Sequence, residues 1–232
     1  MWSDPWLLQR GHTLRCEQRD FPEWHRGRPY YLCWVIDADT PAVRARWQQA
    51  RTALQQLLLP AYGRQPHVTI ALGGFPQTQA EPQAINAAGL LAQLQGLRQA
   101  AIAPFTLQIG RLDSFASVPY LQVHADSTGY ADARQALLTQ EALAEAHVPH
   151  LTLGHYADAW PLATLVSCRA RVPEQVTALP VQQLRLVAYA PHDIGGRLLP
   201  VAAWDLQQQA LHWHDSHLLG PIAAGVLAAA GV

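Results

Sequence analysis

The spacing of apolar residues along the chain changes between the two-residue repeat of strands and the three-to-four-residue repeat of helices. Helices are predicted at 41–58, 85–100, 128–146 and 161–168, and strands at 30–37, 65–72, 105–109, 120–125, 149–153, 181–190 and 198–206. Thr40 is placed to cap the first helix, with Pro41 at its first position and Pro60 beyond its end.

The order of these elements repeats. A strand and a helix lead to a short strand that contains His67, and later another strand and helix lead to a short strand that contains His150. A chain that runs twice through one α+β unit is expected to fold as two related lobes that share an interface. We place these lobes within residues 29–206, between an N-terminal extension (1–28) and a C-terminal extension (207–232).

Half of the 232 residues are apolar, which is enough for one large core or for two small lobes. The net charge of −1 excludes a chain-wide basic field of the kind that binds long nucleic acid. All 16 basic residues are arginines, which favours forked contacts to phosphate, although a compositional bias of the gene gives the same pattern. Any nucleic-acid partner is therefore expected to be bound locally.

The cysteines and the termini bear on location. Cys16, Cys33 and Cys168 are far apart and form no CxxC pair, so neither a disulfide framework nor a thiolate zinc site is predicted. The first residues lack the pattern of a signal peptide, and the apolar run 218–232 is shorter than a membrane span usually is. We expect a cytoplasmic monomer that does not bind membranes and whose C-terminal run docks as a helix.

One pentapeptide, Pro-His-apolar-Thr-apolar, occurs twice, at 66–70 and at 149–153. Residues i and i+2 of a strand point to the same face, so His67 lies beside Thr69 and His150 lies beside Thr152. The apolar residues between them enter the core. Two copies at equivalent places of a repeated unit are hard to explain by chance.

Two imidazoles and two hydroxyls suit displacement at the phosphorus of a 2′,3′-cyclic phosphate. The attacking and leaving oxygens lie on opposite sides of phosphorus, so one histidine takes a proton from water while the other protonates the ribose oxygen. The threonine hydroxyls then bind the non-bridging oxygens. No metal or other cofactor is required, but the nearest nitrogens of His67 and His150 must face one cleft within roughly 9 Å.

The two His-x-Thr motifs resemble the signature of the two-histidine (2H) phosphoesterase superfamily, and the element order is similar to its bacterial RNA 2′,3′-cyclic phosphodiesterase and 2′-5′ RNA ligase branch. The resemblance implies a bilobal α+β fold with antiparallel sheets lining a central cleft and helices outside. It implies that His67 and His150 are catalytic, the first as acid and the second as base, and that Thr69 and Thr152 bind the phosphate. The substrate implied is a cyclic or 2′-linked phosphate of a nucleotide or an RNA end, which the enzyme hydrolyses or ligates.

The sequence departs from the family five residues after the second histidine, where many relatives have arginine and this chain has His155. In a regular strand His155 faces away from His150 unless Gly154 opens a bulge, so we interpret His155 as structural. Arg64 or Arg197 is then expected to supply the missing phosphate contact. Aromatic residues that could stack on a base, but that more often belong to a core, are Phe75, Tyr120, Tyr156 and Tyr189.

The run from His212 to His217 has the density of a metal site. Its order does not match the His-x-His-x-Asp-His run of metallohydrolases, and no later His, Asp or Cys completes it, so we interpret it as solvent-facing. Two alternatives to the phosphodiesterase remain. One is a non-catalytic module that binds a nucleotide or RNA end on the same fold, and the other is a metal-dependent hydrolase built on this run.

Overall fold

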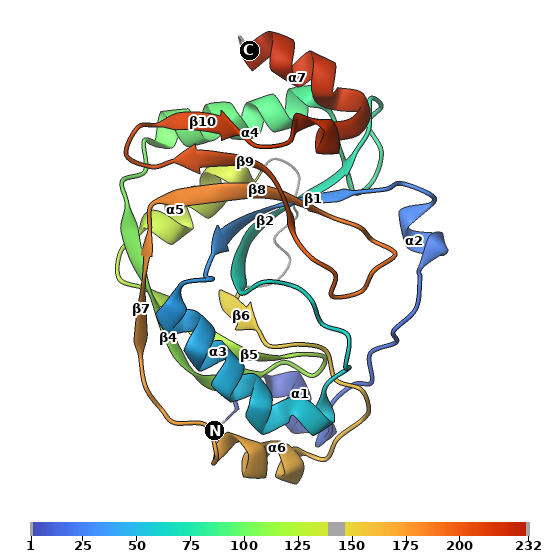
Figure 1. The fold of residues 1–232 in the computed structure, drawn as a ribbon, viewed down its shortest axis with the longest axis vertical. Helices are drawn as coiled ribbons and strands as arrows, with labels where there is room; N and C mark the ends of the chain where they lie inside the picture. Colours follow the sequence, from blue (N-terminus) through green and yellow to red (C-terminus); the bar gives the residue numbers. More distant parts are fainter. Residues whose placement is uncertain (1, 139–146, 231–232) are drawn as a thin grey trace.

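The computed structural model describes residues 2–138 and 147–230 (Figure 1). The strands are β1 (Tyr31–Asp37), β2 (His67–Pro76), β3 (Ala84–Ile85), β4 (Phe105–Ser114), β5 (Pro119–Ala125), β6 (His150–Thr152), β7 (Thr177–Val181), β8 (Gln183–Tyr189), β9 (Leu199–Asp205) and β10 (Ala210–Trp213). The helices are α1 (Pro5–Arg10), α2 (Pro22–His25), α3 (Pro41–Leu54), α4 (Ala87–Ala100), α5 (Gly129–Leu137), α6 (Leu162–Arg169) and α7 (Ala223–Ala230), with 3₁₀ segments η1 (Gln55–Leu57) and η2 (Ser216–Ile222).

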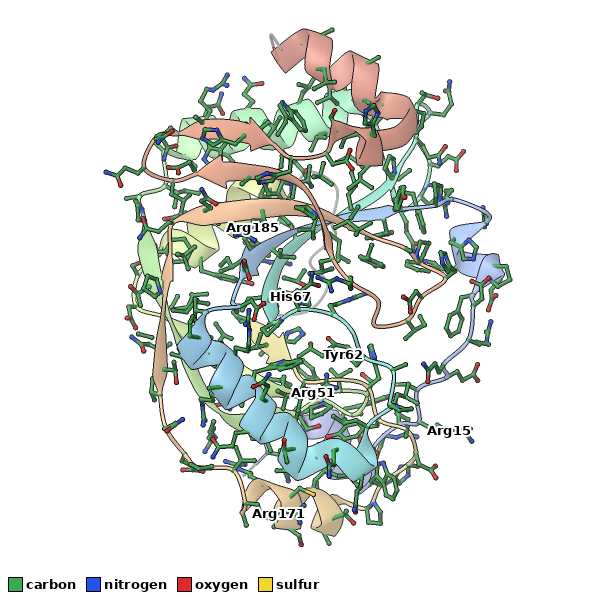
Figure 2. The ribbon with its side chains drawn as sticks, viewed as in Figure 1. Arg15, Arg51, Tyr62, His67, Arg171 and Arg185 are labelled. Carbon is green, nitrogen blue, oxygen red and sulfur yellow. The ribbon has the colours of Figure 1, made fainter. Side chains whose placement is uncertain are left out.

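The strands form one hydrogen-bonded path in the order β10-β9-β8-β1-β2-β6-β5-β4-β7, with β3 beside β2. All neighbours on this path are antiparallel, and only the short β3 runs parallel to its partner. The path consists of a first half-sheet (β10, β9, β8, β1, β2) and a second half-sheet (β6, β5, β4, β7). His67 lies in the middle of the molecule, where the halves meet (Figure 2).

Helices cover the outside of both halves. In Figure 1, α4 and α7 lie at the top against the first half-sheet, whereas α1, α3 and α6 lie around the second. Helix α5 contacts β2 of the first half-sheet and α4. The α+β fold with antiparallel sheets and outer helices, which the sequence predicted, is confirmed.

Most of the predicted elements form where the pattern placed them. The hydroxyl of Thr40 accepts a hydrogen bond from the amide of Val43 at 3.4 Å, and Asn86 caps α4 in the same way at 2.8 Å. Because Asn86 is the cap and Ile85 pairs in β3, α4 begins two residues later than predicted. The helix predicted at 128–146 is described only as α5, since residues 139–146 lie outside the described residues.

Other elements were not predicted. Strand β4 continues to Ser114, beyond the predicted end at residue 109, because a bulge between Ile109 and Leu112 keeps the strand paired with β5. The sequence pattern also missed the short elements α1, α2, β3, β7 and β10. Each has six residues or fewer, too few for a period to be recognised.

The core runs through both half-sheets and includes residues from both proposed extensions. Trp2 and Leu7 from the N-terminal segment are buried in it, as are Leu219, Ile222 and Val226 from the C-terminal run. That run therefore docks as η2 and α7. None of the helices among the described residues has the length and apolar character needed to cross a bilayer. The boundaries at 28/29 and 206/207 remain predictions.

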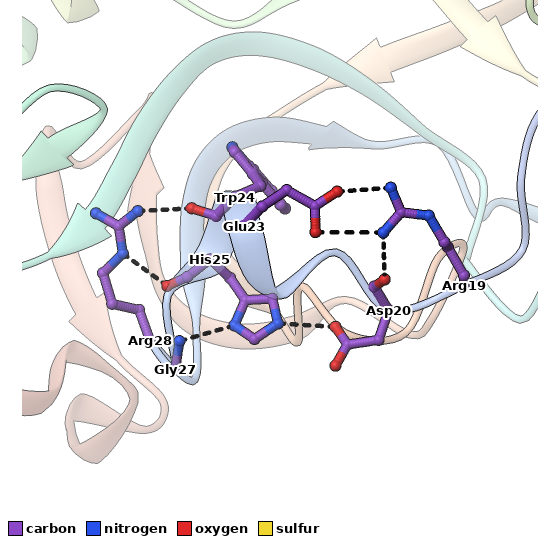
Figure 3. Close-up of polar contacts among 7 residues, drawn as sticks. All are labelled: Arg19, Asp20, Glu23, Trp24, His25, Gly27 and Arg28. Atoms are coloured by element: carbon purple, nitrogen blue, oxygen red, sulfur yellow. Dashed lines mark hydrogen bonds and ion pairs between the residues drawn. The ribbon is translucent and has the colours of Figure 1, made fainter.

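The N-terminal segment also contains a local polar network around His25 (Figure 3). The amide of Gly27 donates to His25 Nδ1 at 3.1 Å, so Nε2 carries the proton and donates to Asp20 at 2.7 Å. Arg28 donates to the carbonyls of Trp24 and His25 and lies 3.6 Å from the ring centroid of Phe75 in β2. This segment is thereby attached to the far end of the motif strand, away from His67.

Candidate functional site

Pairing of the two motif strands brings their polar residues to one face. Val68 of β2 pairs with Leu151 of β6 in antiparallel register, and both side chains are fully buried. In such a ladder the flanking residues lie opposite one another, so this register sets His67 against Thr152 and Thr69 against His150. The two histidines are then diagonal neighbours, with their Cα atoms about 7–8 Å apart. The four residues (His67, Thr69, His150, Thr152) are called the His-Thr cradle below.

Both histidine rings are held in the same way. Nδ1 of His67 lies 2.8 Å from the carbonyl of Gln65, and Nδ1 of His150 lies 2.8 Å from the carbonyl of Val148. A carbonyl only accepts, so each Nδ1 carries the proton and each neutral ring keeps a basic Nε2. The proline before each histidine keeps the preceding backbone extended, which allows this contact to form twice.

Burial sets the protonation of the cradle. The pKa of His67 is lowered to about 4, mainly by burial and also by the positive charges of Arg64 and His150, against the opposing hydrogen bond to Gln65. Burial also lowers the pKa of His150. The His150 ring packs edge-on against Phe115 and Tyr120, with centroids 5.1 and 5.5 Å away. Both imidazoles are therefore neutral near pH 7 in the free protein and are able to accept a proton.

Side chains from two helices bind backbone carbonyls of the motif strands, at each cradle threonine and at the residue after it. From α3, Trp47 Nε1 donates to the carbonyl of Thr152 at 2.9 Å, and Arg51 Nη1 donates to that of Leu153 at 2.9 Å. From α5, the Tyr130 hydroxyl donates to the carbonyl of Thr69 at 2.8 Å. Arg134 Nη1 from the same helix lies 2.5 Å from the carbonyl of Ile70.

These four donors (Trp47, Arg51, Tyr130, Arg134) are called the carbonyl clamp below. Each repeat supplies two of them to the motif strand of the other repeat. Helix α3 belongs to the first repeat and binds the second motif strand, whereas α5 belongs to the second repeat and binds the first. In β2 the register passes from Thr69 opposite Val35 to Ala71 opposite Trp34, so Ile70 is the extra residue of a bulge. The clamp thus fixes the backbone of each cradle threonine from the opposite repeat.

Sequence reasoning missed the clamp, but a signal for it exists. An aromatic residue followed four positions later by arginine occurs in both helices, as Trp47 with Arg51 and as Tyr130 with Arg134. Residues four apart lie on the same helix face. A search for patterns shared by the two repeats outside the strands would have found this pair.

Arg64 lies near the cradle. Its Nε donates to the carbonyl of Gly196 at 3.0 Å, and its guanidinium carbon lies 4.5 Å from the ring centroid of Tyr189. Its charge acts on both His67 and His155 and lowers the pKa of each. Arg64 is therefore within electrostatic range of His67.

Arg197 is more peripheral. It is exposed and lines, together with His67, a cavity of about 400 Å³. Asp37 and Arg185, which also line this cavity, form an ion pair of 2.5 Å. Its floor includes the apolar side chains of Val35, Val187 and Leu198.

His155 follows the end of β6, so strand alternation no longer decides its face. Gly154 before it has a φ of 153°, which side chains rarely adopt, and turns the backbone. The His155 ring lies edge-on to Tyr62 with centroids 5.5 Å apart. Burial lowers the pKa of His155 to about 4, helped by Arg64. A structural role for His155 stays a prediction.

The aromatic candidates are buried or half-buried, and some of them lie near the cradle. Phe75 and Tyr156 are fully buried, Tyr120 is buried against His150, and Tyr189 is half-buried beneath Arg64. Among residues 2–138 and 147–230, no group of His, Cys, Asp or Glu is arranged to hold a metal ion. The exposed His212 belongs to β10 and lies outside the cradle.

Comparisons with known proteins bear on the family and the fold of the chain. Residues 39–193, more than half of the chain, match the family model of the 2′-5′ RNA ligase superfamily. Similar solved structures include TT0787 of Thermus thermophilus (19% identity, TM-score 0.51, covering 76% of this chain and 98% of that one) and the apo form of Escherichia coli LigT (16%, 0.52, 77% and 98%). LigT complexed with 3′-AMP is 22% identical with a TM-score of 0.50, covering 78% of this chain and 100% of that one. None of the curated protein sequences matches the chain.

Proposed function

Because the chain belongs to the 2′-5′ RNA ligase superfamily, the group of 2H phosphoesterases, we propose that it is a metal-independent phosphodiesterase that hydrolyses 2′,3′-cyclic phosphates of nucleotides or RNA ends. The observation that carries the proposal is the pairing of Val68 with Leu151, which sets two equivalent His-x-Thr strands against each other. A crystal structure of LigT with 3′-AMP, a ribonucleotide, supports this substrate class by analogy.

In the proposed reaction a water oxygen bonds to phosphorus and one phosphorus–ribose oxygen bond breaks. One histidine Nε2 takes the proton that water loses, and the other histidine gives a proton to the departing ribose oxygen, so the two rings exchange protonation states. The hydroxyls of Thr69 and Thr152 donate to the non-bridging oxygens, whose charge rises in the transition state. When the 5′-hydroxyl of another ribose attacks phosphorus in place of water and the 3′ oxygen departs, the same displacement gives a 2′-5′ link.

The acid must hold a proton before the reaction, and the negative phosphate stabilises that proton. His67 has the strongly lowered pKa and lies near the cationic Arg64, so it is the harder ring to protonate. We therefore assign the base to His67 and the acid to His150, the reverse of what the family resemblance implies. Arg64 and Arg197 are proposed to neutralise the phosphate, with Arg64 as the main contact.

The test measures turnover of adenosine 2′,3′-cyclic phosphate by wild type, His67→Ala and His150→Ala, with and without a chelator. We expect each substitution to lower kcat at least about 100-fold, the size of a general acid–base contribution, with no effect of chelator. Binding with negligible turnover in all three would favour the non-catalytic module. Chelator-sensitive activity that survives His67→Ala would favour the metal-dependent hydrolase.

The acid and base roles are separated with a 4-nitrophenyl phosphodiester, whose leaving group departs without protonation. His150→Ala should keep more of its activity on this substrate than on the cyclic phosphate, whereas His67→Ala should lose activity on both. The opposite pattern would restore the assignment that the resemblance implies.

A further inference from the structure

Arg51 places a positive charge beside the second motif. Its Nη1 donates to the carbonyl of Leu153, which directly follows Thr152, at 2.9 Å. Its guanidinium carbon lies 4.6 Å from the ring centroid of Trp47 and 5.0 Å from that of Tyr62. Within the described parts of the chain, Arg51 is not among the arginines that pair with a carboxylate. The guanidinium of Arg51 therefore interacts with the carbonyl of Leu153 and with the aromatic rings of Trp47 and Tyr62.

Among the described residues, none supplies an anion to Arg51. Burial lowers its pKa, which indicates that the guanidinium has lost part of its hydration. A guanidinium offers five N–H groups, and a partly buried cation is stabilised most by an opposite charge that accepts several of them. An anion beside Arg51 would supply that charge.

A groove of about 480 Å³ opens next to Arg51. Its other lining residues are neutral, and they are Gln48, Thr52, Gln55, Leu58, Leu59 and Pro60. The volume falls within the range of small-ligand sites, and the two glutamine amides are able to donate to phosphate or sugar oxygens. Arg51 therefore contacts the residue directly after Thr152 and also lines this groove.

We propose that Arg51 binds a second phosphate of the substrate, the one adjacent to the reacting cyclic phosphate, so that the preferred substrate is an RNA or oligonucleotide end. This inference rests on the proposed function of the His-Thr cradle. A forked guanidinium matches two oxygens of a phosphodiester, which a mononucleotide cyclic phosphate lacks at this position. The groove beyond Arg51 then receives the preceding nucleotide.

The test compares two substrates that differ by one nucleotide and its phosphate: adenosine 2′,3′-cyclic phosphate, and the dinucleotide ApA with a 2′,3′-cyclic end. The kcat/KM for each is measured with wild type, with Arg51→Gln and with Arg44→Gln, which alters an exposed arginine of the same helix. The ratio of the two kcat/KM values is independent of the fraction of folded protein.

We expect wild type and Arg44→Gln to prefer the dinucleotide and Arg51→Gln to lose that preference by about 10- to 100-fold, the contribution of charge-assisted hydrogen bonds. Equal losses on both substrates would mean that Arg51 only holds Leu153, and they would overturn the proposal. A wild type without preference would do the same. If wild type turned over neither substrate, the proposed function would fail, and calorimetric titration with ApA 3′-phosphate would then decide whether Arg51→Gln weakens binding.

Discussion

The carbonyl clamp makes a quantitative prediction for Tyr130→Phe. The Tyr130 side chain is only 5% exposed, and its hydroxyl donates to the carbonyl of Thr69 at 2.8 Å and lies 2.7 Å from Nε2 of His147. Phenylalanine keeps the ring but removes the donor, leaving a buried carbonyl without this bond. Such a loss costs about 1–3 kcal/mol. For a chain of this size the midpoint of thermal unfolding falls by about 2–4 °C per kcal/mol, so by roughly 2–12 °C.

The same substitution is expected to lower activity, because it frees the strand that carries the Thr69 hydroxyl. Displacements of about 1 Å are known to cost up to about 100-fold in rate. We therefore expect kcat on the cyclic phosphate to fall, with KM changed less. Trp47→Phe removes the matching donor to Thr152 from the other repeat and should have an effect of similar size.

The assay combines thermal unfolding, followed by circular dichroism, with initial rates of hydrolysis on the same preparations. Tyr30→Phe is the control, since Tyr30 precedes β1 at the opposite end from Asp37, the partner of His67. Unchanged stability and unchanged kcat in Tyr130→Phe would refute the clamp. Lower stability with unchanged kcat would leave it a structural contact without influence on the cradle.

Two further predictions concern charge. Burial lowers the pKa of His67, His147 and His155 from 6.5 to about 4, so between these values the unfolded chain binds more protons than the folded one. The free energy of unfolding should therefore rise from pH 4 to 6.5 and level off above pH 6.5, and the rise should be less steep in His67→Asn. Urea unfolding at a series of pH values measures this dependence. An equal slope in the variant would contradict the burial of His67. Arg64→Gln should lower kcat/KM about tenfold or more, and Arg197→Gln should lower it by a smaller factor, because Arg64 is half-buried near His67 whereas Arg197 is exposed. Steady-state kinetics measure both values. The reverse order would exclude Arg64 as the main phosphate contact.

The sequence alone was sufficient for the local features of the protein. The periods of two and of three to four residues placed most of the long strands and helices, because an apolar face must be buried whatever it packs against. The repeated pentapeptide set His67 beside Thr69 and His150 beside Thr152, since alternation along a strand is a local property. Proline before each histidine also fixed the extended backbone that lets Nδ1 reach a carbonyl.

Tertiary structure decided how the repeats meet. The Val68–Leu151 register, the exchange of α3 and α5 between the repeats, and the position of Arg51 all depend on pairing between residues more than 60 positions apart. Periodicity within a segment carries no information about such pairs. The protonation of the cradle also belongs to the folded state, because burial, the main cause of the lowered pKa of His67, exists only once the chain has folded.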